Sequence, residues 1–217
     1  FYPVLEGLKR DHPEIRIAIH SALLDERRAR TMASAGIDTA MLDIIGHQDT
    51  IRSVYHLDRT VNDFEEALSA LCSTRMEVVP HIVIGLHYGR ILGELNALEI
   101  ISRHDVHALV LVVIMPFYGT PKKFSTPAPE AIGEIFLESR RRLPTKEVLL
   151  GCARPAGLHK RLTDSYAVMA GLDGIAFPAE GTVSLARTIG RTFNHENACC
   201  SLKMGQSEIQ FPESLTL

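Results

Sequence analysis

Short apolar runs alternate with longer amphipathic stretches along this chain. β-Branched apolar runs bounded by turn residues predict strands, and apolar residues spaced three and four apart predict helices. Runs of the first kind predict six strands, at 15–20, 39–45, 77–86, 108–115, 148–150 and 174–177. Stretches of the second kind predict helices at 2–12, 25–35, 61–73, 91–103, 129–142, 162–170 and 182–191. Regular alternation of strand and helix is typical of a parallel α/β protein.

Turn and capping residues separate these elements. Gly36 closes the second helix, and Thr60 is the expected N-cap of the third. We predict loops at Asp49–Asp58 and along the Pro- and Gly-rich link Pro116–Pro129, where Gly119-Thr120-Pro121 is typical of a turn.

Six βα units are two short of the eight in a TIM-type barrel. We therefore predict an α/β fold, a (βα) barrel of which about six units are present. An open six-stranded sheet is the alternative, and its two edge strands would need cover. We expect the barrel to occupy residues 1–192 and a polar C-terminal tail to follow at 193–217. Because the chain starts at Phe1, inside a helical pattern, we expect it to be a piece of a longer reading frame.

Composition excludes several classes of protein. Of the 217 residues 46% are hydrophobic and 23% charged, as in an ordinary globular protein. A net charge of −3 without a basic stripe argues against a nucleic-acid partner. No apolar run approaches the roughly 20 residues of a membrane span. The four cysteines include no Cys-x-x-Cys pair, so we expect reduced thiols in a cytoplasmic protein and no structural zinc.

Polar residues that could carry chemistry follow the predicted strands, where βα barrels keep their active sites. His20, His81 and His87 could be metal ligands in a hydrolase, or each could be an ordinary hydrogen-bonded residue. Asp43 ends an apolar strand, and a buried carboxylate needs a partner. Its role could therefore be functional, or it could be one half of a structural ion pair.

Later strands contribute a second set of candidates. Arg154 is suited to holding a carboxylate or phosphate, or it could cap its strand. Cys152 could be a small core residue, a ligand or a reactive thiol. We predict Arg154 and Cys152 as catalytic residues. Cys199 and Cys200 lie in the polar tail, where one of them could ligate a metal or a cluster.

Six short motifs occur in order along the chain. They are Met41-Leu42-Asp43, Tyr55-His56 with 61–68, 82–86, Gly119-Thr120-Pro121, Cys152-Ala153-Arg154 and 169–175. With these motifs, the stretch from Thr39 to about Phe177 resembles the C-terminal two-thirds of a radical SAM enzyme of the biotin synthase-like group. The segments at 81–94 and 149–157, together with the late Cys-Cys pair, look most similar to an archaeal-type, two-component lipoyl synthase.

The resemblance implies a βα barrel that binds a 4Fe–4S cluster and S-adenosylmethionine and generates a deoxyadenosyl radical. It implies that Asp43 holds the ribose of the nucleoside and that Val83 and Gly85 pass near the adenine. Arg154 would face the substrate side of the barrel mouth. We also place His20, His81 and His87 on that side.

This sequence departs from the family in two respects. The three closely spaced cysteines that hold the radical cluster are absent, and so are the first two strands. We therefore expect the cluster ligands upstream of this chain and expect this chain alone to be inactive. Val79 and Leu149 stand where biotin synthase has a cysteine and an arginine for its second cluster, which argues against that activity. Cys152, Cys199 and Cys200 could instead serve a different auxiliary iron–sulfur cluster.

The resulting hypothesis is reductive cleavage of S-adenosylmethionine with hydrogen abstraction from an unactivated carbon, with sulfur insertion as in biotin or lipoate synthesis as one outcome. The substrate would be a small molecule or a lipoyl or acyl protein, and a second radical SAM subunit could be a partner. Two alternatives stay open. One is a non-catalytic barrel subunit that binds a nucleoside or a partner protein, and the other is a metal-dependent barrel hydrolase.

Overall fold

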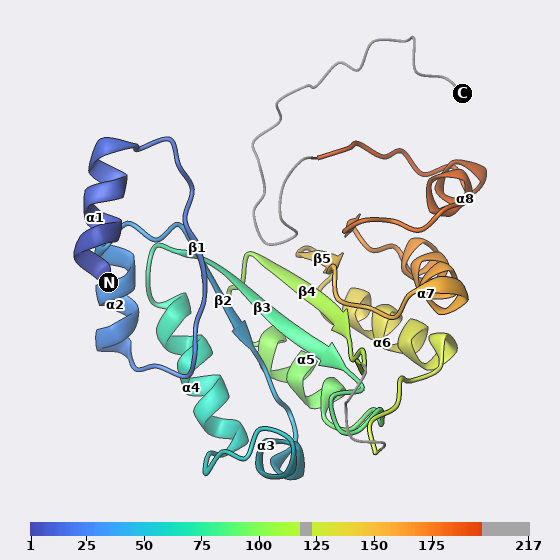
Figure 1. Cartoon of the computed structure of the whole chain (residues 1–217), viewed down its shortest axis with the longest axis horizontal. Helices are drawn as coiled ribbons and strands as arrows, with labels where there is room; N and C mark the ends of the chain where they lie inside the picture. Colours follow the sequence, from blue (N-terminus) through green and yellow to red (C-terminus); the bar gives the residue numbers. More distant parts are fainter. Residues whose placement is uncertain (118–122, 197–217) are drawn as a thin grey trace.

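A six-stranded, all-parallel sheet forms the centre of the molecule, and its strands lie side by side in chain order (Figure 1). The computed structural model describes residues 1–117 and 123–196. The strands are β1 (Ala18–His20), β2 (Thr39–Asp43), β3 (Glu77–Ile84), β4 (Ala108–Val113), β5 (Glu147–Leu150) and β6 (Gly174–Ile175). Sequential order is that of neighbouring strands in a (βα) barrel, whereas a doubly wound sheet reverses its order at a switch point. The predicted fold class, a barrel-type array of six βα units, is confirmed.

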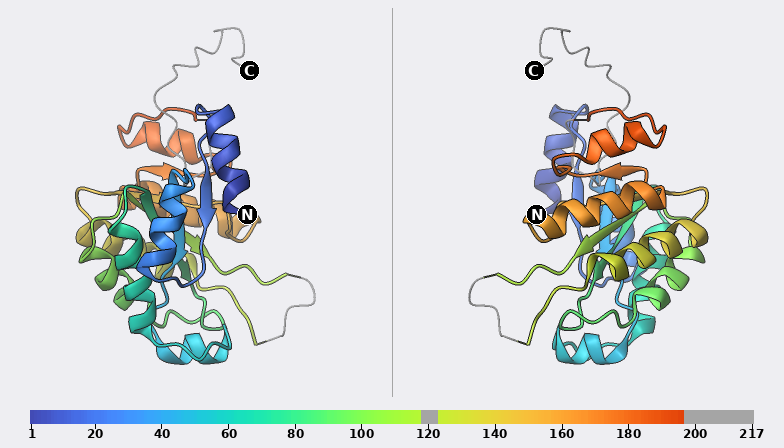
Figure 2. Two further views of the ribbon diagram at one scale, coloured as in Figure 1. Left: turned by 90° about the vertical axis from the view of Figure 1, so that its left-hand side faces the viewer. Right: turned by 90° about the vertical axis from the view of Figure 1, so that its right-hand side faces the viewer.

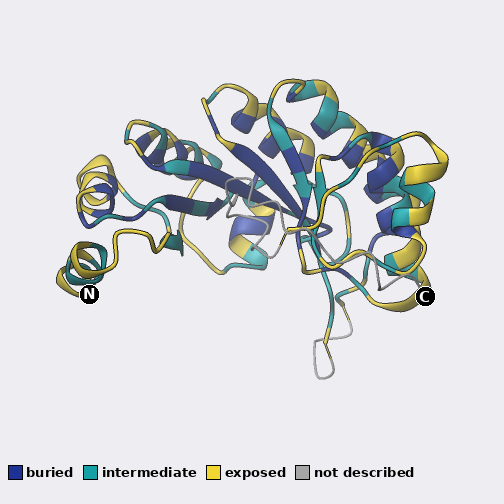
Figure 3. Ribbon diagram, turned by 90° about the horizontal axis from the view of Figure 1, so that it is seen from above, coloured by how far each residue is buried: buried dark blue, intermediate teal, exposed yellow. Residues whose placement is uncertain are grey.

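Helices flank the curved sheet, and most of them lie along its convex face (Figure 3). They are α1 (Tyr2–Asp11), α2 (Glu26–Ser34), α3 (Gln48–Ser53), α4 (Val61–Cys72), α5 (Glu94–Ser102), α6 (Pro129–Arg142), α7 (Gly157–Ala170) and α8 (Thr182–Thr188). Figure 2 shows α1 and α2 at the β1 edge and α7 and α8 at the β6 edge. No helix in the described part of the chain is both long and apolar enough to cross a bilayer.

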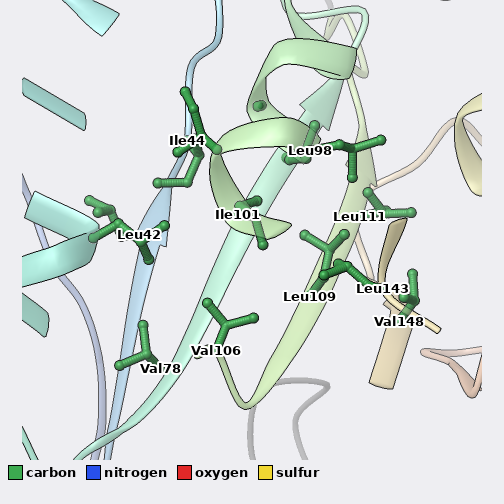
Figure 4. Packing of buried hydrophobic residues seen from close by; sticks show 14 of the residues in the cluster. Leu42, Ile44, Val78, Leu98, Ile101, Val106, Leu109, Leu111, Leu143 and Val148 are labelled. Carbon is green, nitrogen blue, oxygen red and sulfur yellow. The ribbon is translucent and has the colours of Figure 1, made fainter. Parts of the chain in front are cut away.

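The period of two along each strand sends alternate side chains to opposite faces. Leu109 and Leu111 of β4 pack against Leu98 and Ile101 of α5, in the core between sheet and helices (Figure 4). Burying each such side chain stabilises the fold by about 1.5–3 kcal/mol. The concave face carries a smaller apolar cluster, which consists of Val79, Ala108 and Val110 with Met41, Val112 and Leu149 packed against it.

Thr60 caps α4 as predicted. Its hydroxyl accepts the Asp63 N–H at 3.3 Å while the Asp63 carboxylate accepts the Thr60 N–H at 2.6 Å, a reciprocal capping box. The predicted loop at 49–58 was partly wrong, because α3 forms there. This helix has six residues, which is too short for a hydrophobic period to appear, and its N-cap is His47, whose ring accepts the Asp49 N–H.

Several element boundaries also differ from the predictions. Helices α5 and α7 begin at Glu94 and Gly157 rather than at 91 and 162, and β1 begins at Ala18 rather than at 15. Gly93 occupies the N-cap of α5 with a φ of 113°, a position that the sequence pattern does not mark. Most of the predicted tail, residues 197–217, lies outside the described residues, as does Gly119-Thr120-Pro121. The predicted boundary after residue 192 stays a prediction.

Candidate functional site at the mouth of the barrel

Three polar side chains from adjacent strands meet on the concave face, at the C-terminal ends of β1, β2 and β3. His20 ends β1 and pairs in register with Met41 of β2, while Asp43 of β2 pairs with His81 of β3. His20 Nε2 lies 3.2 Å from Asp43 Oδ1. The rings of His20 and His81 are 5.1 Å apart between centroids. Parallel register therefore brings together residues that are far apart in the sequence.

Tyr55 completes this cluster from the segment that follows α3. Its hydroxyl donates a hydrogen bond of 3.1 Å to Asp43 Oδ2, so both carboxylate oxygens of Asp43 accept a bond. The next residue, His56, has a φ of 53°, which turns the chain sharply away. In the sequence, Tyr55 was noted only as part of the Tyr55-His56 motif, without a predicted role in the site. Nothing in the sequence near Tyr55 marked it, because its contact with Asp43 depends on tertiary packing.

The cluster holds Asp43 as an anion. Burial acts to raise the pKa of the Asp43 carboxyl, but the hydrogen bond and charge of His20 and the bond from Tyr55 leave that pKa below its ordinary value. The hydrogen bond to Asp43 raises the pKa of the His20 imidazole against the opposing effect of burial. Desolvation is the main reason why the pKa of the Tyr55 hydroxyl is raised, and the Asp43 charge adds to it.

His81 is the buried member of the cluster. His81 is only 8% exposed, and its Nδ1 lies 3.0 Å from the carbonyl oxygen of Val79. Burial, with a further contribution from the charge of His20, lowers the pKa of the His81 imidazole. Of the two imidazoles, His20, beside Asp43, is therefore the one on which a proton is favoured.

His87 lies apart from this cluster. It follows β3, and its Nδ1 lies 3.1 Å from Thr50 Oγ1 on α3. In residues 1–117 and 123–196 no group of three or more His, Cys, Asp or Glu is placed to hold a metal ion. The turn after β3 directs His87 toward α3, so it does not join His20 and His81. The predictions that the three histidines ligate a metal or lie on the substrate side stay predictions.

The segment predicted to pass near an adenine ends β3. Val83 is partly exposed and pairs in register with Val112 of β4. Gly85 has a φ of 81°, and a Cβ there would lie 2.4 Å from Pro127 Cγ, so only glycine fits. The Gly85 N–H donates a 2.7 Å bond to Glu94 Oε1. Whether Asp43, Val83 and Gly85 bind a nucleoside stays a prediction.

Arg154 is buried in the loop after β5 rather than open to the mouth. Its guanidinium makes a two-pronged contact with Asp164 of α7, at 2.6 Å from Nε and 3.1 Å from Nη2. It also donates to the carbonyl oxygens of Gly151, Ala176 and Phe177. Both side chains of the ion pair are 0% exposed. This geometry favours a structural role that joins the ends of β5, α7 and β6, and the predicted catalytic role stays a prediction.

Of the four cysteines, Cys72 and Cys152 lie in the part of the chain that the structure describes. Cys152 is exposed, so the interpretation of it as a small core residue was wrong. The preceding residue, Gly151, is buried, and a Cβ on Gly151 would lie 2.6 Å from Val112 Cγ1. The chain turns outward immediately after it, at Cys152. Its role as a ligand or reactive thiol stays a prediction. Cys199 and Cys200 lie outside the described residues.

Comparison with known proteins identifies the architecture. No family model and no curated protein matches the sequence. The crystal structure of HydG, a maturase of the FeFe-hydrogenase, matches with a TM-score of 0.60 and 13% identity over 80% of this chain and 41% of that chain. HydG from Carboxydothermus hydrogenoformans gives a TM-score of 0.58 and 18% identity over 80% and 43%. Methylornithine synthase (PylB) gives 0.56 and 14% over 81% and 50%.

The chain has the fold of the radical SAM enzymes. It spans half or less of the length of these solved structures. Identities of 13–18% carry the likeness of fold and no more. The narrower resemblance to biotin synthase or to lipoyl synthase stays a prediction.

Proposed function

We propose that this chain forms the nucleoside-binding part of a radical SAM enzyme, with Asp43 as the acceptor for the ribose hydroxyls of S-adenosylmethionine. The observation that supports this most is the charged, hydrogen-bonded Asp43 at the C-terminal end of a strand on the concave face. Its side chain is 29% exposed, so a ligand in the mouth can reach it. The C-terminal ends of barrel strands are where enzymes of this architecture bind substrates.

The chemistry of Asp43 fits a vicinal diol. An ionised carboxylate is purely an acceptor with about four lone-pair positions, of which His20 and Tyr55 use two. Two ribose hydroxyls could donate to the others, and charge-assisted bonds of this kind are the strong ones. The partly exposed Val83 lies two residues beyond His81, the register partner of Asp43, and offers an apolar contact for a flat base.

The residues in the described part of the chain do not fit an iron–sulfur cluster. Such a cluster needs several thiolates, and the two described cysteines stand on separate elements, Cys72 at the end of α4 and Cys152 after β5. When bound, S-adenosylmethionine and its cluster would supply the radical, while this chain would orient the nucleoside and exclude water.

The finer parts of the hypothesis are hydrogen abstraction from an unactivated carbon and sulfur insertion into a small molecule or a lipoyl or acyl protein, with a second radical SAM subunit as a partner. Val79 and Leu149 belong to the apolar cluster on the concave face. They would line the mouth without a ligand for a second cluster of the biotin synthase type. This supports an activity other than that of biotin synthase.

Binding of S-adenosylhomocysteine and adenosine, measured by isothermal titration calorimetry, tests the proposal. Loss of charged hydrogen bonds is worth about 1.5–3 kcal/mol, so Asp43→Asn should weaken binding about tenfold to a hundredfold. Wild-type protein should bind 2′,3′-dideoxyadenosine more weakly than adenosine, and Asp43→Asn should lose this discrimination.

Asp105→Asn is the matched control, because Asp105 is an exposed carboxylate on the N-terminal side of β4, away from the mouth. Equal affinity of wild type and Asp43→Asn for adenosine would overturn the proposal. If the nucleoside binds but a longer chain carrying the cysteine triplet does not cleave S-adenosylmethionine, the non-catalytic binding subunit becomes the better explanation.

A further inference from the structure

Glu94 is a buried carboxyl group with one oxygen that the fold does not pair. It is the first residue of α5 and is 5% exposed. Oε1 accepts the Gly85 N–H at 2.7 Å, whereas Oε2 is buried and has no hydrogen-bond partner among the described residues. A buried, unpaired polar atom is uncommon in a folded protein and calls for a physical explanation.

Glu94 also lines a small cavity of about 20 Å³ beneath the barrel mouth. The other lining residues are mainly aliphatic and come from the ends of β2 and β3 and from α5; they include Ile44, Ile82 and Val83. A cavity of this size can hold one water molecule and no larger ligand. Thr50 is the lining residue with a polar side chain besides Glu94, and its hydroxyl is hydrogen-bonded to His87.

An ionised Glu94 has no counter-ion in this environment. No described residue that lines the cavity carries a positive charge. Burial raises the pKa of the Glu94 carboxyl, and this effect outweighs the lowering by backbone hydrogen bonds, of which the bond from Gly85 contributes most. A neutral carboxylic acid removes the uncompensated charge and still accepts the Gly85 N–H.

The backbone that Glu94 holds is the segment of β3 that reaches the mouth. Gly85 is fixed from two sides, by the bond to Glu94 and by contact with Pro127. Two residues earlier, Val83 is partly exposed on the concave face. The segment after β2 is also held against the start of α5. Gly46 packs against the Gly93 carbonyl, and Asn96 Nδ2 donates to the Gly46 carbonyl at 2.8 Å.

We propose that Glu94 is a positioning residue: its buried carboxyl group fixes the Val83–Gly85 end of β3 so that the mouth is preformed for a flat, apolar ligand group beside Asp43. The ligand part of this inference rests on the proposed function. The positioning part, which concerns Glu94 and Gly85 alone, does not. Glu94 contacts the backbone N–H of Gly85 and not the ligand, so its effect on ligand binding is indirect.

Two substitutions separate positioning from charge. Glu94→Gln keeps an acceptor for the Gly85 N–H and cannot ionise, whereas Glu94→Met fills similar space without an acceptor. Loss of one buried hydrogen bond corresponds to about a tenfold change. We expect Glu94→Met to speed hydrogen exchange of the Gly85 amide about tenfold and to weaken adenosine binding by a similar factor. Glu94→Gln should stay near wild type in both, as should Glu99→Gln, which changes an exposed glutamate of the same helix.

Carbon-13 NMR of the Glu94 carboxyl in the 217-residue protein supplies a direct readout. Its titration midpoint should lie above the ordinary value of 4.5. An ordinary midpoint, or unchanged Gly85 exchange in Glu94→Met, would overturn the inference. If wild type does not bind adenosine at all, the proposed function fails, and the Gly85 exchange rates still decide whether Glu94 positions the strand end.

Discussion

The buried ion pair between Arg154 and Asp164 offers the sharpest test of a structural against a catalytic interpretation. Arg154→Met removes a guanidinium that is wholly buried and that binds one carboxylate and three carbonyl oxygens. Asp164→Asn removes the negative charge and keeps the shape. If Arg154 holds the ends of β5, α7 and β6 together, both substitutions should destabilise the fold.

The structure sets the size of each effect. Breaking a buried ion pair by removing one partner costs about 3–5 kcal/mol. Arg154→Met should fall near the lower end, about 3 kcal/mol, because Lys160 Nζ stays 3.3 Å from Asp164 and the Ala179 N–H still donates to it. Asp164→Asn should approach about 5 kcal/mol, because the guanidinium then has no anion.

Urea unfolding followed by circular dichroism measures these free energies. Arg30→Met is the matched control, since the Arg30–Glu26 pair on α2 is 72% and 65% exposed and should contribute less than about 0.5 kcal/mol. The double variant Arg154→Met/Asp164→Leu should recover part of the loss, because no uncompensated charge remains. A loss below about 1 kcal/mol for Arg154→Met would refute the structural interpretation and favour the predicted catalytic role.

Three further outcomes follow from the structure. Cys152 should react with iodoacetamide well before Cys72, whose pKa burial raises to about 11; peptide mapping by mass spectrometry identifies each site. Gly46→Ala should lower stability by at least about 2 kcal/mol in urea unfolding, because its Cβ would lie 2.1 Å from the carbonyl oxygen of the α5 N-cap glycine; an unchanged midpoint would contradict this packing. The contact of His20 with Asp43 should stabilise the fold fully below the ordinary His20 pKa of 6.5 and lose its effect as pH rises through the raised folded value. The difference in stability between wild type and His20→Gln should therefore shrink between neutral and alkaline pH.

The sequence determined the number, type and order of the six βα units, because each unit buries one apolar face and so shows its period locally. It also indicated that the polar residues at strand ends share one face, since parallel strands all point the same way. Thr60 and Gly36 marked helix ends through capping and backbone rules that need only a few neighbouring residues.

Only the tertiary structure decided which of those polar residues meet. The register of β1, β2 and β3 sets His20 beside Asp43 and near His81, and the turn after β3 separates His87 from them. Sequence reasoning did not pair Arg154 with Asp164 or assign any role to Glu94, because burial and partners are properties of packed surfaces. A charged residue looks the same in the sequence whether it faces a ligand or, as Arg154 does, a buried carboxylate.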